Sequence, residues 1–468
     1  MYFQQFYLGC LAHASYMIGS DGEVAVIDPQ RDVEIYLDEA KKQGLRVAHV
    51  IETHLHADFV SGHRELAERT GAKVYLGADS GATFPHVPVR DGDELRVGRL
   101  RLRFLETPGH TVESICIVVH DEESGSPDPV AVFTGDTLFI GDVGRPDLSP
   151  NHTPAELAGL LYDSLHQKLL KLPDSTAVYP AHGAGSLCGR QISSEKASTI
   201  GRERQTNYAL QPMSREQFIA LLTDELPDRP DYFAKEVEIN RTGAAPLAEL
   251  EPLHALSAAE VEALREQGAV VLDTRPPNQF CAAHVPGSVS IALSGQFASW
   301  GGILLGLDAK VVLVAEEDER IEEARVRLAR VGLENVLGFL EDGIQGWQAS
   351  GRELASIPQI TCHELHRALS EDPDPPLVID VRNPAEWKAG HIAQAIPMPL
   401  RHVASRAGEL DRSRHIAVHC KSGYRSTIAA GLLRRAGFEH VANVVGGFDA
   451  WAASQLPVTV DPAASSSS

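Results

Sequence analysis

The sequence lacks the features that mark several large classes of protein. It has no uninterrupted run of 18 apolar residues, so we expect no membrane-spanning helix. It has no cluster of lysine and arginine and carries a formal net charge of −22, which argues against a nucleic acid as a partner. The N-terminus lacks a basic segment followed by an apolar one, so we expect no signal peptide and a cytoplasmic protein.

Cysteine is scarce and scattered along the chain. The 468 residues include six cysteines, and no two of them form a Cys-x-x-Cys motif. They are Cys10, Cys116, Cys188, Cys281, Cys362 and Cys420. This pattern is typical of a reducing compartment, where thiols are reactive rather than structural. The length predicts about three domains, and a hydrophobic content of 43% is enough for their cores.

A dense cluster of potential metal ligands follows the apolar segment 47–51, which we predict to be a buried strand. His54, His56 and Asp58 form an H-x-H-x-D motif directly after it. Imidazole nitrogens and carboxylate oxygens bind first-row transition metals well, and the end of a strand fixes their direction. Phe59 follows, where hydrolases that bind two zinc ions usually have a histidine. We therefore expect one metal ion per chain.

Three further motifs each place a polar residue just after a short apolar segment. They are 107–111 with His110, 133–138 with Asp136 and 179–183 with His182. Potential ligands placed in this way ring one edge of a packed sheet. Together with the first cluster, in this order, the motifs resemble the metallo-β-lactamase superfamily over about residues 1–245. The resemblance implies an αββα fold for this part of the chain.

The second half of the chain contains a duplication. Three segments recur: 272–277 as 379–384, 280–285 as 387–392, and 342–347 as 446–451. Each copy alternates apolar strands with amphipathic helices, which predicts an α/β domain with a mostly parallel sheet. We place the copies at about 253–353 and 358–460, and we predict a disordered tail over 461–468 because of its low complexity.

The second copy carries a candidate nucleophile. Cys420 directly follows segment 416–419, which we predict to be a buried strand, and opens a six-residue loop that closes at Arg425 before an alanine- and leucine-rich helix. The backbone N–H groups of such a loop favour an anion, and the guanidinium adds positive potential, so the thiolate is favoured. This Cys-x-x-Gly-x-Arg loop resembles the rhodanese sulfurtransferases. The expected catalytic residues of this loop are Cys420 and Arg425, and those expected to bind the substrate are Lys421, Ser422, Gly423 and Tyr424.

The first copy lacks this nucleophile. Ala315 stands where the second copy has Cys420, and the four residues that follow, 316–319, are all acidic. Their carboxylates would repel an anionic persulfide or thiosulfate. We therefore predict a catalytically inactive rhodanese-like domain.

The complete arrangement resembles the persulfide dioxygenase–rhodanese fusions. This resemblance implies Fe(II), one per chain, held by His54, His110 and Asp136. Two histidines and one carboxylate leave three coordination positions for O₂ and substrate, whereas zinc has no redox chemistry. The implied reaction oxidises a low-molecular-weight thiol persulfide, such as glutathione persulfide, to sulfite. A persulfide on Cys420 then exchanges sulfur, with thiosulfate as donor or product. We also expect a homo-oligomer.

Five other residues are candidates for roles around the metal site. We interpret His56, Asp58 and His182 as hydrogen-bonding groups around the metal, with direct ligation as the alternative. Arg145 either orients the metal site, binds a substrate carboxylate or forms a surface ion pair. Cys188 lies in a glycine-rich loop six residues after His182, and such a loop lets the backbone pass close to a site. We predict a catalytic Cys188; the alternative is a small packed residue.

Two other functions fit parts of this pattern. The first is a zinc hydrolase of the glyoxalase II type, which acts on a glutathione thioester. Phe59 and the fused rhodanese domains argue against it. The second is a non-enzymatic sensor of sulfur or thiols, which the intact loop at Cys420 argues against.

Overall fold

The computed structural model describes residues 1–224, 226 and 228–460. The chain forms two compact units. The first comprises Met1–Glu251 with Val326–Glu334, and the second comprises Pro252–Arg325 with the chain from Asn335 onward. The predicted disordered tail, 461–468, lies outside the described residues. Among the helices of the described part, none is long and apolar enough to cross a membrane.

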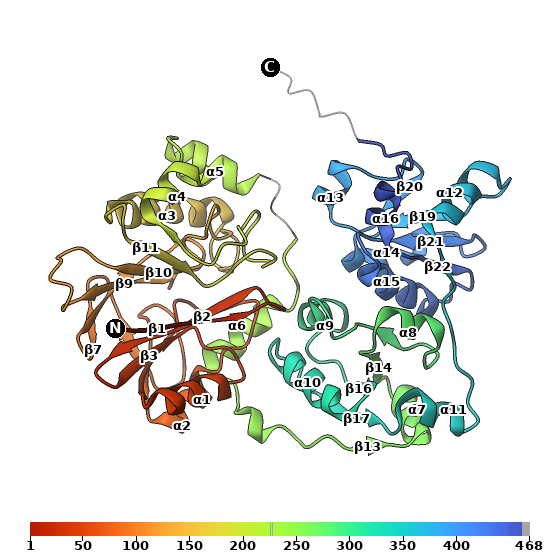
Figure 1. The fold of residues 1–468 in the computed structure, drawn as a ribbon, viewed down its shortest axis with the longest axis horizontal. Helices are drawn as coiled ribbons and strands as arrows, with labels where there is room; N and C mark the ends of the chain where they lie inside the picture. Colours follow the sequence, from red (N-terminus) through yellow and green to blue (C-terminus); the bar gives the residue numbers. More distant parts are fainter. Residues whose placement is uncertain (225, 227, 461–468) are drawn as a thin grey trace. The chain divides into compact units, whose positions relative to one another are not determined.

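The first unit is built on two six-stranded sheets (Figure 1). One has the order β1-β2-β3-β4-β5-β6, with antiparallel pairing up to β3 and parallel pairing beyond it. Its strands are β1 Tyr2–Leu8, β2 His13–Ser20, β3 Glu23–Ile27, β4 Arg46–Ile51, β5 Lys73–Gly77 and β6 Val87–Val89. The other has the order β12-β11-β10-β9-β8-β7. Its strands are β7 Glu94–Val97, β8 Leu100–Glu106, β9 Ile115–Asp121, β10 Ala131–Gly135, β11 Ala177–Pro180 and β12 Ser198–Thr199.

The two sheets face each other across an apolar core, and helices cover their outer faces. Side chains such as Tyr16, Phe104 and Phe133 fill the space between the sheets. The helices are α1 Glu34–Gln43, α2 His63–Thr70, α3 Pro154–Gln167, α4 Ile200–Thr206, α5 Arg215–Thr223 and α6 Phe233–Thr242. Tyr36 and Leu66 belong to the core outside the first sheet, and residues of α3 and α5 belong to the core outside the second. This is the expected αββα fold.

The second unit contains two five-stranded parallel sheets with the same strand order. They are β13-β17-β16-β14-β15 and β18-β22-β21-β19-β20. The first has β13 Ala255–Leu256, β14 Val270–Asp273, β15 Val289–Ser290, β16 Val311–Val314 and β17 Val336–Leu340. The second has β18 Gln359–Ile360, β19 Leu377–Asp380, β20 Ala395–Pro397, β21 Ile416–His419 and β22 Val441–Val444. The predicted pair of α/β domains is confirmed.

Helices connect the parallel strands in both copies. In the first copy they are α7 Ala258–Glu266, α8 Pro277–Ala282, α9 Phe297–Leu305, α10 Asp318–Ala329 and α11 Gly343–Ala349. In the second copy they are α12 Cys362–Glu371, α13 Pro384–Ala389, α14 Val403–Arg406, α15 Tyr424–Arg435 and α16 Gly447–Ala453. This alternation follows from parallel pairing, because a parallel strand is reached only through a long crossover.

The repeated Asp-x-Arg motif has the same structural role in both copies. Asp273 and Asp380 end equivalent strands, and each carboxylate forms a buried ion pair with the arginine two residues later, Arg275 or Arg382. Each arginine also donates to a backbone carbonyl eight residues further on. The recurring sequence therefore forms the same buried ion pair in both copies. Burial of the two charges is tolerated because each has a partner.

Candidate metal centre and sulfur-transfer loop

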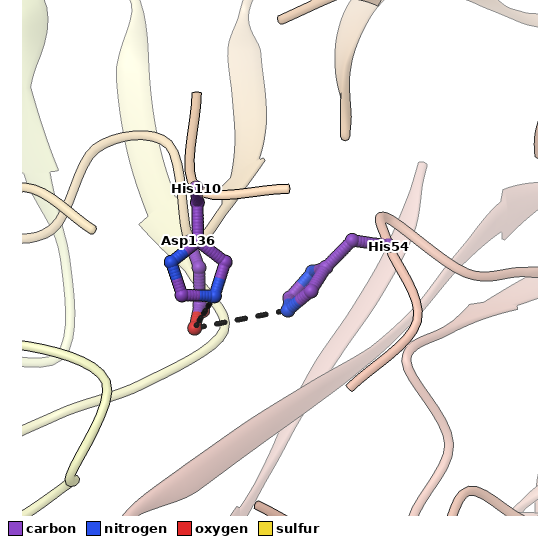
Figure 2. A group of neighbouring side chains, drawn as sticks. All are labelled: His54, His110 and Asp136. Atoms are coloured by element: carbon purple, nitrogen blue, oxygen red, sulfur yellow. Dashed lines mark ion pairs between the residues drawn. The ribbon is translucent and has the colours of Figure 1, made fainter. Parts of the chain in front are cut away.

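Three predicted metal ligands from separate parts of the chain meet at one edge of the two sheets (Figure 2). His54 follows β4, His110 lies in the turn between β8 and β9, and Asp136 follows β10. One carboxylate oxygen, Asp136 Oδ2, lies 3.3 Å from His110 Nε2 and 3.8 Å from His54 Nε2. All three side chains are buried. The structure therefore brings this set together as the sequence predicts.

The atoms that face one another in this group are suited to hold a cation. His54 Nδ1 lies 3.0 Å from the hydroxyl of Thr53, and His110 Nδ1 lies 3.0 Å from the carbonyl of Arg145. The opposite ring nitrogens and Asp136 Oδ2 have no hydrogen-bond partner among the described residues. Buried polar atoms are nearly always satisfied, and an ion bound at this point would satisfy all three.

Burial also keeps the histidines in the form that binds metals. It lowers the pKa of His110, and it lowers the pKa of His54 well below its usual range, with neighbouring histidines adding to the shift. A neutral imidazole keeps a lone pair for a metal ion. The pKa of Asp136 falls below its usual value, because the charge and hydrogen bond of His182 outweigh the effect of burial.

His182 lies behind the ligand group and links two carboxylates. Its Nδ1 is 2.8 Å from Asp136 Oδ1, and its Nε2 is 2.9 Å from Asp58 Oδ2. Burial would lower the pKa of His182, but the two carboxylates raise it well above its usual value. Both ring nitrogens therefore hold carboxylates in place, and the role of His182 and Asp58 around a bound metal stays a prediction.

An aromatic ring fills the space beside this pair. The ring centroid of Phe59 lies 4.0 Å from that of His13 and 4.3 Å from that of His56. His56 directs Nε2 toward the buried carboxylates of Asp28 and Glu52, at 3.2 and 3.4 Å. Phe59 thus packs against two histidine rings, and a phenyl ring cannot coordinate a metal ion.

Cys188 approaches the same region. One ligand atom from each of Asp58, His182 and Cys188 lies within 4.8 Å of the other two, and all three residues are buried. Burial raises the pKa of the Cys188 thiol well above its usual value, and the negative charges of Asp58 and Asp136 raise it further. The glycine-rich loop therefore places the thiol of Cys188 next to His182 and Asp58, and the raised pKa favours the protonated thiol.

Arg145 connects the loop of Cys188 to a metal ligand. Its side chain is 4% exposed and forms a bidentate ion pair with Asp147 at 2.6 and 2.8 Å. Its backbone N–H donates to the carbonyl of Cys188, and its own carbonyl accepts a hydrogen bond from His110 Nδ1. The ion pair is therefore buried rather than at the surface, and Arg145 joins the two loops.

The structure adds residues that the motifs do not reveal. Asp28 accepts hydrogen bonds from the N–H and hydroxyl of Thr53, at 2.7 and 2.9 Å, and so fixes the residue before His54. Glu113 accepts from the N–H of Leu55 at 3.0 Å. A carboxylate just after the apolar segment 24–27 is a weak signal for Asp28 in the sequence. We find no comparable signal for Glu113.

Glu236 of α6 is a fully buried carboxyl group near the site. Neither of its oxygens has a hydrogen-bond partner within the described part of the chain. Burial raises its pKa well above the usual value, and the negative charge of Asp58 adds to the shift. The side chain is therefore neutral in the folded protein. Keeping it protonated lowers the free energy of unfolding more as the pH rises.

We expect Glu236→Gln to stabilise the first unit at neutral pH. A carboxyl with a higher pKa in the folded state destabilises the protein increasingly as the pH rises above the unfolded value of 4.5. The variant should gain about 1–3 kcal/mol at neutral pH and lose this advantage at lower pH. Thermal unfolding measured between pH 4 and 8 tests this. Glu238→Gln, on the exposed side of the same helix, is the control; equal midpoints for wild type and Glu236→Gln at every pH would contradict it.

The loop in the second copy has the geometry of an anion cradle. Cys420 follows β21 and is 1% exposed, and the backbone N–H of Gly423 donates to its sulfur at 3.1 Å. Gly423 has a φ of 117°, which residues with a side chain rarely adopt. Helix α15 begins at the next residue, Tyr424, so its N-terminus faces the loop.

Two contacts in this loop could not be foreseen from the motif. Arg425 forms a bidentate ion pair with Glu386 of α13, with both distances at 2.7 Å. This pair fixes the guanidinium beside the loop but offsets its charge. The hydroxyl of Tyr424 donates to the carbonyl of Ala292 in the first copy, at 3.0 Å. The substrate-binding roles of Lys421, Ser422, Gly423 and Tyr424 and the catalytic role of Arg425 stay predictions.

The first copy carries alanine at the position of the nucleophile. Val314 pairs with Asp273 as His419 pairs with Asp380, so Ala315, one residue on, corresponds to Cys420. The acidic loop that follows contacts α8, because the side chain of Gln279 donates to Glu316. The register therefore places Ala315 at the position of Cys420, and the inactivity of the first copy stays a prediction.

Comparisons with known proteins agree with this architecture. Residues 8–182 match the metallo-beta-lactamase superfamily, and residues 257–350 and 361–454 each match the rhodanese-like domain. A hydroxyacylglutathione hydrolase from Polaromonas sp. is 30% identical over 235 residues, which cover 45% of this chain and 84% of that protein. The chain belongs to the metallo-beta-lactamase superfamily.

Other members of the superfamily are similar to the same extent. The mitochondrial persulfide dioxygenase ETHE1 of Bos taurus is 31% identical over 216 residues, which cover 44% of this chain and 75% of that protein. The crystal structure of a metallo-beta-lactamase from Staphylococcus aureus is 32% identical with a TM-score of 0.66, and covers 73% of this chain and 98% of that one. Since a hydrolase and a dioxygenase are equally similar, the site residues must decide between their chemistries.

Proposed function

We propose that this protein is an enzyme of sulfur metabolism with two active centres. The first oxidises a low-molecular-weight thiol persulfide with O₂ and releases sulfite. The second transfers sulfane sulfur through Cys420. The observation that carries the proposal is a buried set of two histidines and one carboxylate, with Phe59 beside it, in a chain that also carries the cysteine loop.

Iron(II) fits the first centre better than a pair of zinc ions does. His54 Nε2, His110 Nε2 and Asp136 Oδ2 would hold it, and when bound it would supply the redox chemistry that activates O₂. The protein contributes rigidity. Thr53 and Arg145 fix the two imidazoles through their other nitrogens, and His182 holds the second oxygen of Asp136. Outer contacts of this kind orient ligands and tune their basicity.

The second centre would exchange sulfur by direct displacement. The thiolate of Cys420 attacks the outer sulfur of thiosulfate, a Cys–S–S⁻ persulfide forms, and sulfite leaves with the electron pair of the broken S–S bond. The N–H of Gly423 and the start of α15 stabilise the anionic sulfur. In the reverse direction, sulfite from the first centre accepts the sulfane sulfur and leaves as thiosulfate.

The main alternative is a zinc-dependent hydrolase of glutathione thioesters. The similarity to a hydroxyacylglutathione hydrolase favours it, and both functions would use a glutathione carrier. Phe59 argues against it, because it stands directly after the H-x-H-x-D motif, where a hydrolase with two zinc ions would have a histidine, and its ring cannot coordinate a metal ion.

Metal analysis combined with two assays separates these functions. The protein is purified without oxygen, its metals are counted, and it is supplied with either glutathione persulfide and O₂ or a glutathione thioester. We expect about one iron per chain, uptake of O₂ and release of sulfite. Two tightly bound zinc ions with rapid thioester hydrolysis would contradict the proposal. The domain boundaries, the homo-oligomer and the cytoplasmic location stay predictions.

Cys188→Ser should alter the persulfide reaction. The thiol lies close to Asp58 and His182. Its loss should therefore change either the rate of O₂ uptake or the ratio of sulfite to thiosulfate, in each case by about tenfold. Cys116→Ser is the matched control, because that thiol is equally buried but contacts Thr107 instead. Steady-state kinetics with glutathione persulfide give the measurement. Kinetics identical to wild type would leave Cys188 a packing residue.

A further inference from the structure

Helix α6 contributes to the metal site although it lies beyond the segment that matches the superfamily, residues 8–182. Asn240, in its last turn, is 1% exposed. Its side chain is directed at the loop after β4, which carries His54, His56 and Asp58. This loop has no helix or strand from residue 52 to residue 62. Its backbone polar groups therefore need partners outside regular structure.

Asn240 supplies three such partners. Its side-chain N–H₂ group donates to the carbonyls of His56 and Phe59, each at 2.8 Å. Its side-chain oxygen accepts from the N–H of Ser61, also at 2.8 Å. The side-chain amide of Asn240 thus makes three hydrogen bonds, two as donor and one as acceptor, to the backbone of residues 56–61. Two N–H donors together with an acceptor are available in one side chain only from asparagine or glutamine.

The segment held in this way positions a chain of contacts that reaches a metal ligand. Asp58 lies between the two carbonyls that Asn240 binds. Its carboxylate is 2.9 Å from His182 Nε2, and His182 Nδ1 is 2.8 Å from Asp136. A displaced loop would move Asp58 and release His182. The Asp136 carboxylate would then lose the hydrogen bond from His182 that orients it.

We propose that Asn240 is a positioning residue of the metal centre. It fixes residues 56–61 and thereby the direction of the Asp136 carboxylate. Asp28 and Glu113 anchor the first half of the loop at Thr53 and Leu55, and Asn240 anchors the second half. The inference rests on the ligand set of the proposed function, but on neither the identity of the metal nor the reaction.

Cobalt(II) binding to the full-length protein tests the proposal without any assay of turnover. Asn240→Ala is compared with Asn207→Ala, a buried asparagine of the same unit whose side chain bonds Asp142 and Ala209 rather than the loop. We expect Asn240→Ala to weaken Co(II) binding about 10- to 100-fold and to change its visible absorption. We expect Asn207→Ala to bind Co(II) as wild type does.

Two results would overturn the inference. One is Co(II) affinity and absorption of Asn240→Ala equal to wild type; the other is an equal loss in both variants. If Asn240→Ala does not fold, Asn240→Asp replaces it, because it keeps the acceptor for Ser61 and lacks both donors; unchanged Co(II) binding by that variant would also refute the proposal. If His110→Ala binds Co(II) as tightly as the wild-type protein does, the ligand set itself is refuted.

Discussion

His110→Ala should lose the metal ion and all O₂ uptake with glutathione persulfide. The substitution removes one of three converging donors, and the remaining two, His54 and Asp136, cannot replace it from their fixed positions. We expect binding to weaken by more than about 100-fold, beyond the usual effect of an outer contact. Metal analysis after anaerobic purification measures the loss.

The control is His120→Ala, on β9 of the same sheet and outside the ligand group. It should keep its metal. Sulfur transfer from thiosulfate should be unchanged in His110→Ala, because Cys420 belongs to the other unit. A full metal content in His110→Ala would remove this histidine from the ligand set.

Cys420→Ser should abolish sulfur transfer from thiosulfate to cyanide, by at least about 1,000-fold. A serine hydroxyl has no thiolate form, so no persulfide can form on it. The N–H of Gly423 then has no sulfur anion to stabilise. The rate of thiocyanate formation gives the measurement, and O₂ uptake with added glutathione persulfide should continue.

Cys362→Ser is the matched control for this result. That thiol is buried in the same domain and contacts the carbonyl of Ala450, away from the loop. It should keep full sulfur transfer. If a folded Cys420→Ser protein lost both activities equally, the two centres would not act separately.

The fold and the grouping of His54, His110 and Asp136 were predictable because their signals are local. Short apolar segments predict strands, and a polar residue just after each of several neighbouring strands predicts a shared sheet edge. His54, His110 and Asp136 meet there, and the duplicated Asp-x-Arg motif marks two equivalent α/β domains. Ala315 in place of Cys420 required only an alignment of the two copies.

The surroundings of these residues depend on tertiary packing. Asn240 contacts the metal loop from 179 to 184 positions along the chain, and Glu236 carries no motif at all. Arg425 looked like a source of free positive charge, yet Glu386 of another helix pairs with it. Hydrogen bonds and charge pairs between distant segments depend on which surfaces pack together, and no periodicity within a single element records that choice. Local patterns therefore predicted the three side chains that meet, and only the packed structure identified the residues that contact their loops.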